Sequence, residues 1–246
     1  PPNLQRFEDV SRTIRASDGT PLRVFTSTDG SWRIPAQFSE IDPRYIDFLI
    51  TYEDKRFWSH HGVDPLAIGR ALGQWIVAGR VVSGASTITM QVVRLLEPRP
   101  RNLLSKSIEV VRAIQLEKRF SKQDILSIYL TLAPFGGNIE GIKAASLAYF
   151  NKPPRQLTIA EAALAVALPQ SPSIYRPDRH RENARKARRK VLKRLHEVEK
   201  ISAREFEEAE ETPLVTQRRR FPFLSPHLAR RLRLENPNAT DVRTHI

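Results

Sequence analysis

The segment ITYEDKRFWSHHGVD, residues 50–64, combines several groups that can do acid–base chemistry. Glu53 follows an apolar helical stretch and precedes Phe57 by about one turn. A carboxylate held against apolar and aromatic groups tends to keep its proton, which suits a general acid or base. Read by itself, the segment is explained more simply as a charged helix end, in which Glu53 and Asp54 pair with Lys55 or Arg56.

Two adjacent histidines, His60 and His61, close the same segment. They lack the i, i+4 helical spacing of a zinc pair, and the sequence has no HExxH motif. We therefore expect no metal site there. One histidine is expected to brace the turn into the next helix.

Two later segments could bind an anion. SGASTITMQ, residues 83–91, places Ser86 and Thr87 among small residues before a helix, where backbone N–H groups can approach a phosphate. RPRNLLSKSIE, residues 99–109, puts Lys106 and Glu109 on one helix face behind an arginine cluster. The plain alternatives are a hydroxyl-rich helix cap and a surface ion pair, and neither segment decides between the two readings.

The elements that must position these groups are mostly helices. Strand-forming residues with two Asp-Gly turns occupy residues 11–34. Asp-Pro signals start two helices, and S/T-x-x-D/E capping boxes start two more. Helices are predicted over residues 42–58, 64–80, 103–120, 121–133, 158–168, 181–201 and 202–212. The helix over 103–120 is amphipathic, with Ile108, Val111 and Ile114 as apolar members, and the helix over 158–168 is apolar enough to be central and buried.

Composition narrows the class of protein. The 246 residues contain 40 Lys and Arg against 27 Asp and Glu, for a net charge of +13, which favours a polyanionic partner. No cysteine is present, so disulfides and a Cys nucleophile are excluded. No apolar run reaches the roughly 20 residues of a membrane helix. The proline- and arginine-rich residues 213–246 are typical of a linker or of the edge of another domain.

The order of the motifs EDKRFWSHHGVD, GASTITMQ, RNLLSKSIE, KQDILSIYL and RRKVL resembles the glycosyltransferase family 51 domain. That domain is the peptidoglycan polymerase of class A penicillin-binding proteins and monofunctional transglycosylases. APFGGN, LPQSPSIYRPDRH and the stretch DGTPLRVF to DGSWRI are most similar to the penicillin-binding protein 1C branch. The resemblance covers roughly residues 40–200.

The resemblance implies a mainly α, lysozyme-like fold with head and jaw lobes and a short β segment at the N-terminus. We expect three parts: residues 1–40 as a β-rich segment after a removed membrane anchor, residues 41–212 as the glycosyltransferase domain, and residues 213–246 as a linker and the start of a missing transpeptidase domain. The expected location is the periplasmic face of the bacterial inner membrane.

The resemblance also assigns residues to roles. Glu53 matches the general base, and Glu109 matches a glutamate that assists at the donor side. Phosphate-contacting positions match Arg56, Arg94, Arg101 and Lys106. Donor-cleft positions match Ser86, Thr87 and Gln91, and the last motif supplies Arg189. Structural positions of the first motif match Asp54, Phe57 and His60.

The implied partners are lipid II, the growing glycan chain, the membrane surface and the inhibitor moenomycin, with further cell-wall synthesis proteins and no nucleic acid. No cofactor is required by the chemistry, although the family resemblance leaves room for Mg²⁺ or Mn²⁺. The reaction would polymerise lipid II with inversion and release undecaprenyl pyrophosphate.

The sequence departs from the family pattern at four positions, Met90, Ser105, Ser127 and Thr131, where the family usually has Gln, Arg, Glu and Asn. Two other functions stay open: a lysozyme-like lytic enzyme that cleaves the same glycan, and a basic, non-catalytic module that binds membrane or nucleic acid. The cationic cluster argues against the first, and the lack of a recognised nucleic-acid-binding motif argues against the second.

Overall fold

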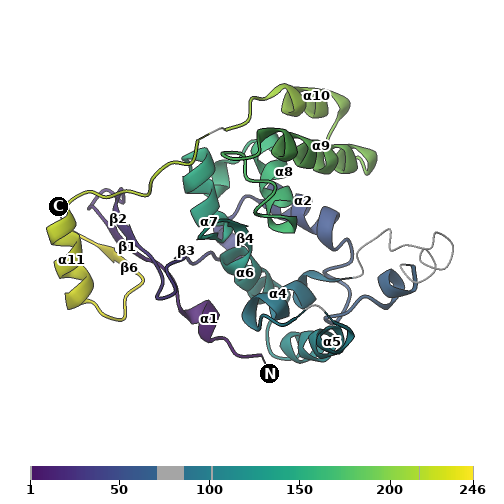
Figure 1. The fold of residues 1–246 in the computed structure, drawn as a ribbon, viewed down its shortest axis with the longest axis horizontal. Coiled ribbons are helices and arrows are strands. Elements are labelled where there is room, and N and C mark those ends of the chain that lie inside the picture. Colours follow the sequence, from purple (N-terminus) through teal and green to yellow (C-terminus); the bar gives the residue numbers. More distant parts are fainter. Residues whose placement is uncertain (1, 71–85, 101, 216, 246) are drawn as a thin grey trace.

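A computed structural model describes residues 2–70, 86–100, 102–215 and 217–245. Its α-helices are α1 (Gln5–Glu8), α2 (Pro43–Glu53), α4 (Ile88–Leu96), α5 (Leu103–Glu117), α6 (Lys122–Leu132), α7 (Ile142–Ala145), α8 (Ile159–Ala167), α9 (Arg181–Glu197), α10 (Ala203–Glu211) and α11 (Pro226–Glu235). Its strands are β1 (Arg12–Arg15), β2 (Pro21–Phe25), β3 (Trp32–Arg33), β4 (Pro134–Gly136), β5 (Ile139–Glu140) and β6 (Asp241–Arg243). The predicted mainly α class with a short β segment near the N-terminus is confirmed (Figure 1).

Short single-turn or π-helical pieces join these elements. They are 3₁₀ helices at Phe38–Glu40, Pro154–Gln156 and Leu168–Gln170, and a π-helix at Ser146–Phe150. The piece Leu168–Gln170 continues α8 and ends beside α2.

The helix starts follow the sequence signals. The Asp42 side chain accepts the N–H of Arg44, and both predicted capping boxes form, from Ser121 at α6 and from Thr158 at α8. Asp64 accepts the N–H of Ala67 and so caps a helix that the structure describes over residues 65–70. The rest of the helix predicted over 64–80 lies outside the described residues.

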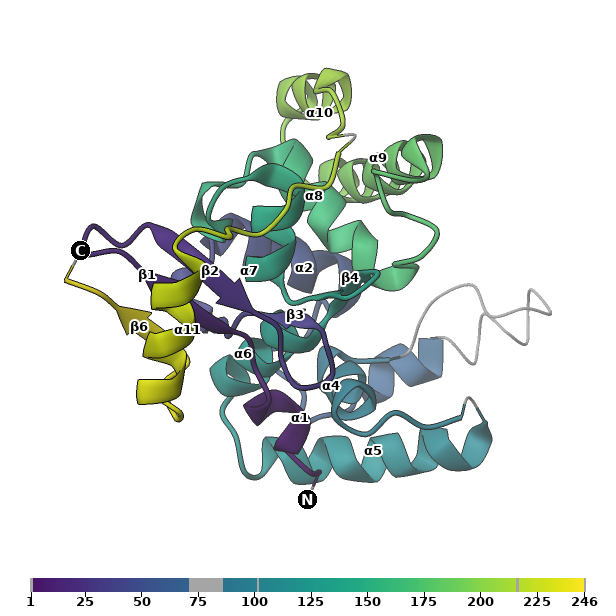
Figure 2. The same cartoon turned by 60° about the vertical axis from the view of Figure 1, so that its left-hand side comes forward.

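A hydrophobic core forms where α2, α4, α6, α8 and α9 pack together, and α5 and α10 lie at opposite ends of this body (Figures 1 and 2). Helix α8 is central and nearly all buried, as predicted, because its small alanine side chains let α2 and α9 approach it closely. This packing brings the C-terminal end of α2 next to the chain that follows α8.

Helix α5 has one buried face, but the predicted apolar residues Val111 and Ile114 lie outside it. Its buried positions include Glu109 and Ala113, whereas Val111 is 55% exposed and Leu103 is 87% exposed. The buried face combines Ala113 and Leu116, which join the hydrophobic core, with Glu109, which pairs with Arg94 of α4. A row of apolar side chains is left on the surface.

The strands form two small sheets, ordered β2-β1-β6 and β3-β5-β4. Strands β1 and β2 are antiparallel across the predicted Asp-Gly turn, where Gly19 has a φ of +88° that favours glycine. Strand β6 pairs in parallel with β1, so α11 and β6 from the C-terminal part lie beside the N-terminal hairpin (Figure 1). The predicted division at residues 40 and 212 stays a prediction.

Buried Arg33 joins segments that are far apart in sequence. Its side chain is fully buried and donates to Glu140 of β5 at 2.7 Å and to Asp29 at 2.7 Å. It also donates to the backbone oxygen of Asp9. The guanidinium therefore ties the N-terminal segment to the β4–β5 hairpin. Among the described residues, no helix is long and apolar enough to cross a membrane.

Candidate active site

Glu53 is the last residue of α2, where the helix end meets two other elements. The Gln91 side chain of α4 donates to Glu53 Oε2 at 2.9 Å, and the Gln170 side chain donates to Oε1 at 3.0 Å. Burial raises the pKa of Glu53, and these two hydrogen bonds oppose the rise only in part. Glu53 is thus a half-buried carboxylate with two neutral donors and a raised pKa.

Glu109 has the opposite surroundings. Arg94 forms two hydrogen bonds with it, at 2.8 and 3.0 Å, and the Lys106 ammonium lies 3.3 Å from the same carboxylate. Burial would raise the pKa of Glu109, but the hydrogen bonds and positive charges of Arg94 and Lys106 lower it overall. The Glu109 side chain is 8% exposed, while those of Arg94 and Lys106 are 37% and 41% exposed. Arg94 and Lys106 therefore reach solvent, whereas the Glu109 carboxylate that they contact is buried.

Two side chains on one face of α4 donate hydrogen bonds to the two carboxylates. Gln91 contacts Glu53 and Arg94 contacts Glu109, and these two α4 residues are three positions apart. Residues at i and i+3 share a helix face, about 4.5 Å apart along the axis. The two glutamates thus contact neighbouring positions of α4, and the pKa is raised in Glu53 and lowered in Glu109.

The segment over residues 50–64 also contains a set of buried contacts that hold it together. The buried Asp54 carboxylate accepts from the His60 ring at 2.8 Å and from the backbone N–H of Ile88 at 2.9 Å. The N–H of Gly62 donates to the other ring nitrogen of His60, so the nitrogen facing Asp54 is the one that carries the proton. Phe57 is fully buried against this ring. These contacts fit the structural roles expected for the three motif residues.

Ser86 and Thr87 have different roles in the second segment. Ser86 accepts a 2.7 Å hydrogen bond from Lys106 and so lies beside the cations. Thr87 is the N-cap of α4, accepting the N–H of Met90 and donating to the Gly62 carbonyl. The helix-cap interpretation therefore holds for Thr87, and Ser86 is the hydroxyl on the cationic side.

The remaining predicted cations are not all in this cluster. Arg56 pairs with Asp64, and Arg189 is 66% exposed and pairs with Glu210 of α10. Arg101 lies outside the described residues. The phosphate-binding roles of all three stay predictions.

Sequence reasoning missed two residues near Glu53. Gln170 donates directly to Glu53, and the positive charge of Lys190 on α9 acts to lower the pKa of Glu53. Lys190 stands in the RRKVL motif, one position after the residue that the motif singled out. No spacing signal identifies Gln170, because its position depends on α8 packing against α2.

The four departures from the family pattern are all accommodated locally. Met90 is buried in the core, and the N–H of Ser105 donates to the Asn102 side chain at the start of α5. Ser127 accepts the N–H of Phe38, and Thr131 accepts the N–H of Ala36. The last two hydroxyls hold the segment before α2 against α6, which is a bracing role.

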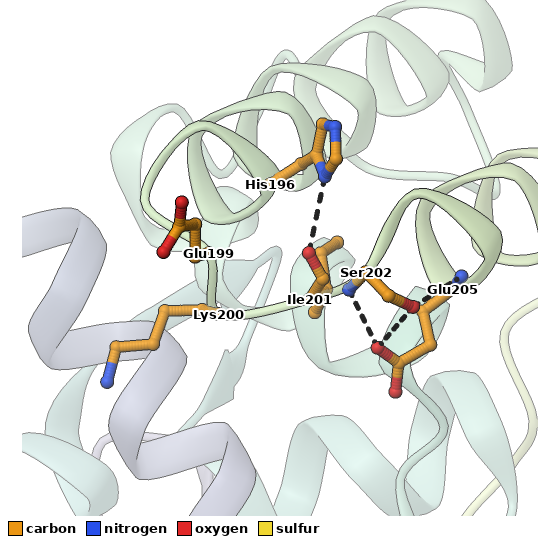
Figure 3. Close-up of a pocket in the computed structure, with 6 residues that line it drawn as sticks. All are labelled: His196, Glu199, Lys200, Ile201, Ser202 and Glu205. Carbon is orange, nitrogen blue, oxygen red and sulfur yellow. Dashed lines mark hydrogen bonds between the residues drawn. The ribbon is translucent and has the colours of Figure 1, made fainter.

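A shallow depression of about 350 Å³ lies elsewhere, at the turn between α9 and α10 (Figure 3). His196 contacts the Ile201 carbonyl there, and Glu205 closes the capping box with Ser202. These polar groups are engaged in shaping the turn, so we assign this depression no chemistry.

Comparison with known proteins decides the family. Residues 18–196 match the family described as transglycosylase. The chain belongs to the transglycosylase family. This transglycosylase chain is 46% identical to penicillin-binding protein 1C of Escherichia coli strain K12, over 89% of the chain and 29% of that protein. It is 36% identical to penicillin-binding protein 1A of Aquifex aeolicus, over 89% of the chain and 29% of that protein.

The transglycosylase chain therefore spans less than a third of the length of these relatives. The crystal structure of penicillin-binding protein 1A from Haemophilus influenzae aligns with 92% of the chain. The alignment covers 24% of that protein, with a TM-score of 0.48 and 20% sequence identity. The predicted membership in the family and the resemblance to the penicillin-binding protein 1C branch are confirmed by the sequence matches.

Proposed function

We propose that this transglycosylase domain polymerises lipid II into β-1,4 glycan strands. The observation that carries the proposal is the pair of glutamates on one face of α4, with pKa values shifted in opposite directions. Two carboxylates whose environments separate their pKa values can take different roles in one reaction. Glu53 is then the base, and Glu109 organises the cations.

In the proposed step, Glu53 accepts the proton from the 4-hydroxyl of the acceptor lipid II. The freed oxygen attacks the anomeric carbon of the growing chain, and the bond from that carbon to the pyrophosphate oxygen breaks. The electron pair leaves with undecaprenyl pyrophosphate, and the anomeric centre is inverted. A carboxylate with a raised pKa is a stronger base than an ordinary one, which suits a hydroxyl as the proton donor.

The proposed binding site for the pyrophosphate is formed by Arg94, Lys106 and Ser86. Negative charge builds up on the leaving group in the transition state, and fixed cations stabilise that charge more than they stabilise the ground state. Glu109 holds Arg94 in place through two hydrogen bonds, so the guanidinium is oriented before substrate arrives. Its carboxylate acts here through its partners and does not itself take up the proton.

The described residues around Glu109 do not fit a divalent cation. Both oxygens of Glu109 already accept from cationic side chains. No group of three or more His, Asp or Glu side chains converges among the described residues. The proposed step therefore uses the cations of the chain itself.

The exposed apolar side chains suit a membrane surface, where the lipid tail of the substrate lies. Leu103 and Leu104 are 87% and 70% exposed at the start of α5, next to the cationic cluster in sequence. Apolar side chains beside positive charge favour an anionic lipid interface. We propose that this end of the domain rests on the periplasmic face of the inner membrane, with other cell-wall synthesis proteins nearby.

The direct test is incubation of the purified chain with lipid II in detergent, with and without a chelator. We expect glycan strands and undecaprenyl pyrophosphate at the same rate in both. Soluble muropeptides released from cell-wall sacculi, without polymer from lipid II, would support the lytic alternative. Salt-sensitive DNA binding with no lipid II turnover would support the non-catalytic one.

A further inference from the structure

The two amides that hold Glu53 come from different parts of the fold. Gln91 belongs to α4, whose face also carries Arg94 on the cationic side. Gln170 comes from a different element, the 3₁₀ helix that continues α8. Each amide takes a different oxygen of the carboxylate, so the carboxylate plane is fixed between them.

The backbone of Gln170 is firmly placed although the residue is exposed. It follows α8, which is buried along almost its whole length, and the N–H of Ser171 donates to the Leu168 carbonyl at 3.3 Å. The next turn also packs against β4, because a Cβ at Gly136 would lie 2.7 Å from the Pro172 carbonyl oxygen. Gln170 therefore presents an exposed amide from a rigid support.

A hydrogen bond from an exposed amide contributes little to folding, because water can replace the donor. Its effect on a reacting group can be larger, since a catalytic carboxylate must be held within about half an ångström of its working position. A carboxylate has about four acceptor sites, so two amide donors still leave room for a substrate hydroxyl. Gln170 is exposed and Glu53 is half-buried, so the contact between them borders solvent.

We propose that Gln170 is a positioning residue that orients Glu53 Oε1 toward the acceptor hydroxyl. This inference rests on the proposed function, because it takes Glu53 as the base of lipid II polymerisation. It adds a residue that lies outside the five sequence motifs. The amide acts in two ways: it fixes the carboxylate plane, and it stabilises the ionised form of Glu53 by donating a hydrogen bond.

The test is the pH profile of kcat/KM for lipid II polymerisation by three variants of the chain. Gln170→Leu removes the donor and should lower kcat about tenfold, with the acid limb displaced to higher pH. Gln170→Glu should displace that limb further in the same direction, because like charges disfavour ionisation. Gln170→Lys should displace it to lower pH. Gln156→Leu is the matched control, since Gln156 is exposed and ends another three-residue 3₁₀ helix.

The outcomes separate this inference from the proposed function. If wild-type chain makes no polymer from lipid II, the proposed function fails. If wild type polymerises and the three Gln170 variants keep the wild-type acid limb, only the positioning role fails. A uniform loss of rate at every pH, with an unmoved limb, would also overturn it, because that pattern indicates a general structural effect. Circular dichroism melting of each variant checks that the fold is retained.

Discussion

At the scale of single residues, the contrast between Glu53 and Glu109 comes from the donors that surround each carboxylate. Glu53 receives neutral amides and lies near buried Tyr45 and Tyr129, whose own pKa values are raised by burial and then by its negative charge. Glu109 receives a guanidinium and an ammonium. Neutral donors leave the cost of burying charge largely uncompensated, whereas cationic donors more than offset it.

This difference predicts how activity depends on pH. A general base works only when it is ionised, so kcat/KM should fall as the pH drops through the pKa of Glu53. Because that pKa is raised, the fall should begin above the ordinary glutamate range of about 4.3. Glu109 has a lowered pKa and stays ionised across the same range. An acid limb at or below the ordinary glutamate pKa would contradict the assignment of Glu53.

Lys106 provides a second test at this scale. It donates to Ser86 and lies 3.3 Å from Glu109, on the side proposed to hold phosphate. Lys106→Ala should weaken binding of moenomycin, a phosphoglycolipid, at least tenfold by fluorescence anisotropy. Lys118→Ala, at an exposed position that follows the same helix, is the control. Unchanged affinity for moenomycin would mean that Lys106 does not take part in phosphate binding.

At the scale of elements, Asp54 links the end of α2 to the start of α4. Its carboxylate, 3% exposed, accepts from both the His60 ring and the Ile88 N–H. Asp54→Ala should leave both donors buried without an acceptor and lower the free energy of unfolding by about 3 kcal/mol. The measurement is chemical denaturation.

The control for Asp54 lies on the same helix. Asp47 pairs with Lys200 at the surface, with 45% of its side chain exposed. Asp47→Ala should change stability by less than about 1 kcal/mol. Equal effects of the two variants would show that Asp54 does not brace α4 as described.

Some features of these elements could be predicted from the sequence, and others could not. Helix starts at Asp42, Ser121 and Thr158 were predictable because caps act within one turn of chain. The inward face of α5 was not, because Glu109 and Glu117 are turned inward by Arg94 and Thr89 of α4. The family motifs pointed to Glu53 and Glu109 but not to Gln170. Contacts between distant segments follow from packing, which no local spacing encodes.

At the scale of the whole molecule, Arg33 connects the N-terminal segment with the β4–β5 hairpin. Removing it would break the ion pairs to Asp29 and Glu140, and Glu140, 13% exposed, would keep Arg6 as a cationic partner. Arg33→Met should lower the free energy of unfolding by about 3–5 kcal/mol. Arg44→Met, at an exposed position in the first turn of α2, should change it by less than about 0.5 kcal/mol. A small loss for Arg33→Met would mean that the segments hold together without it.

The central claim, that Glu53 is the base, is tested most directly by the Glu53→Gln variant in the lipid II polymerisation assay. Glutamine keeps the size of the side chain and can still accept from one of the two amides, so the melting temperature should stay close to that of wild type. Glu182→Gln, at a side chain that is 64% exposed on α9, is the control and should polymerise normally. We predict that Glu53→Gln loses polymerisation by at least a thousandfold. Polymerisation by this variant at near wild-type rate would contradict the account.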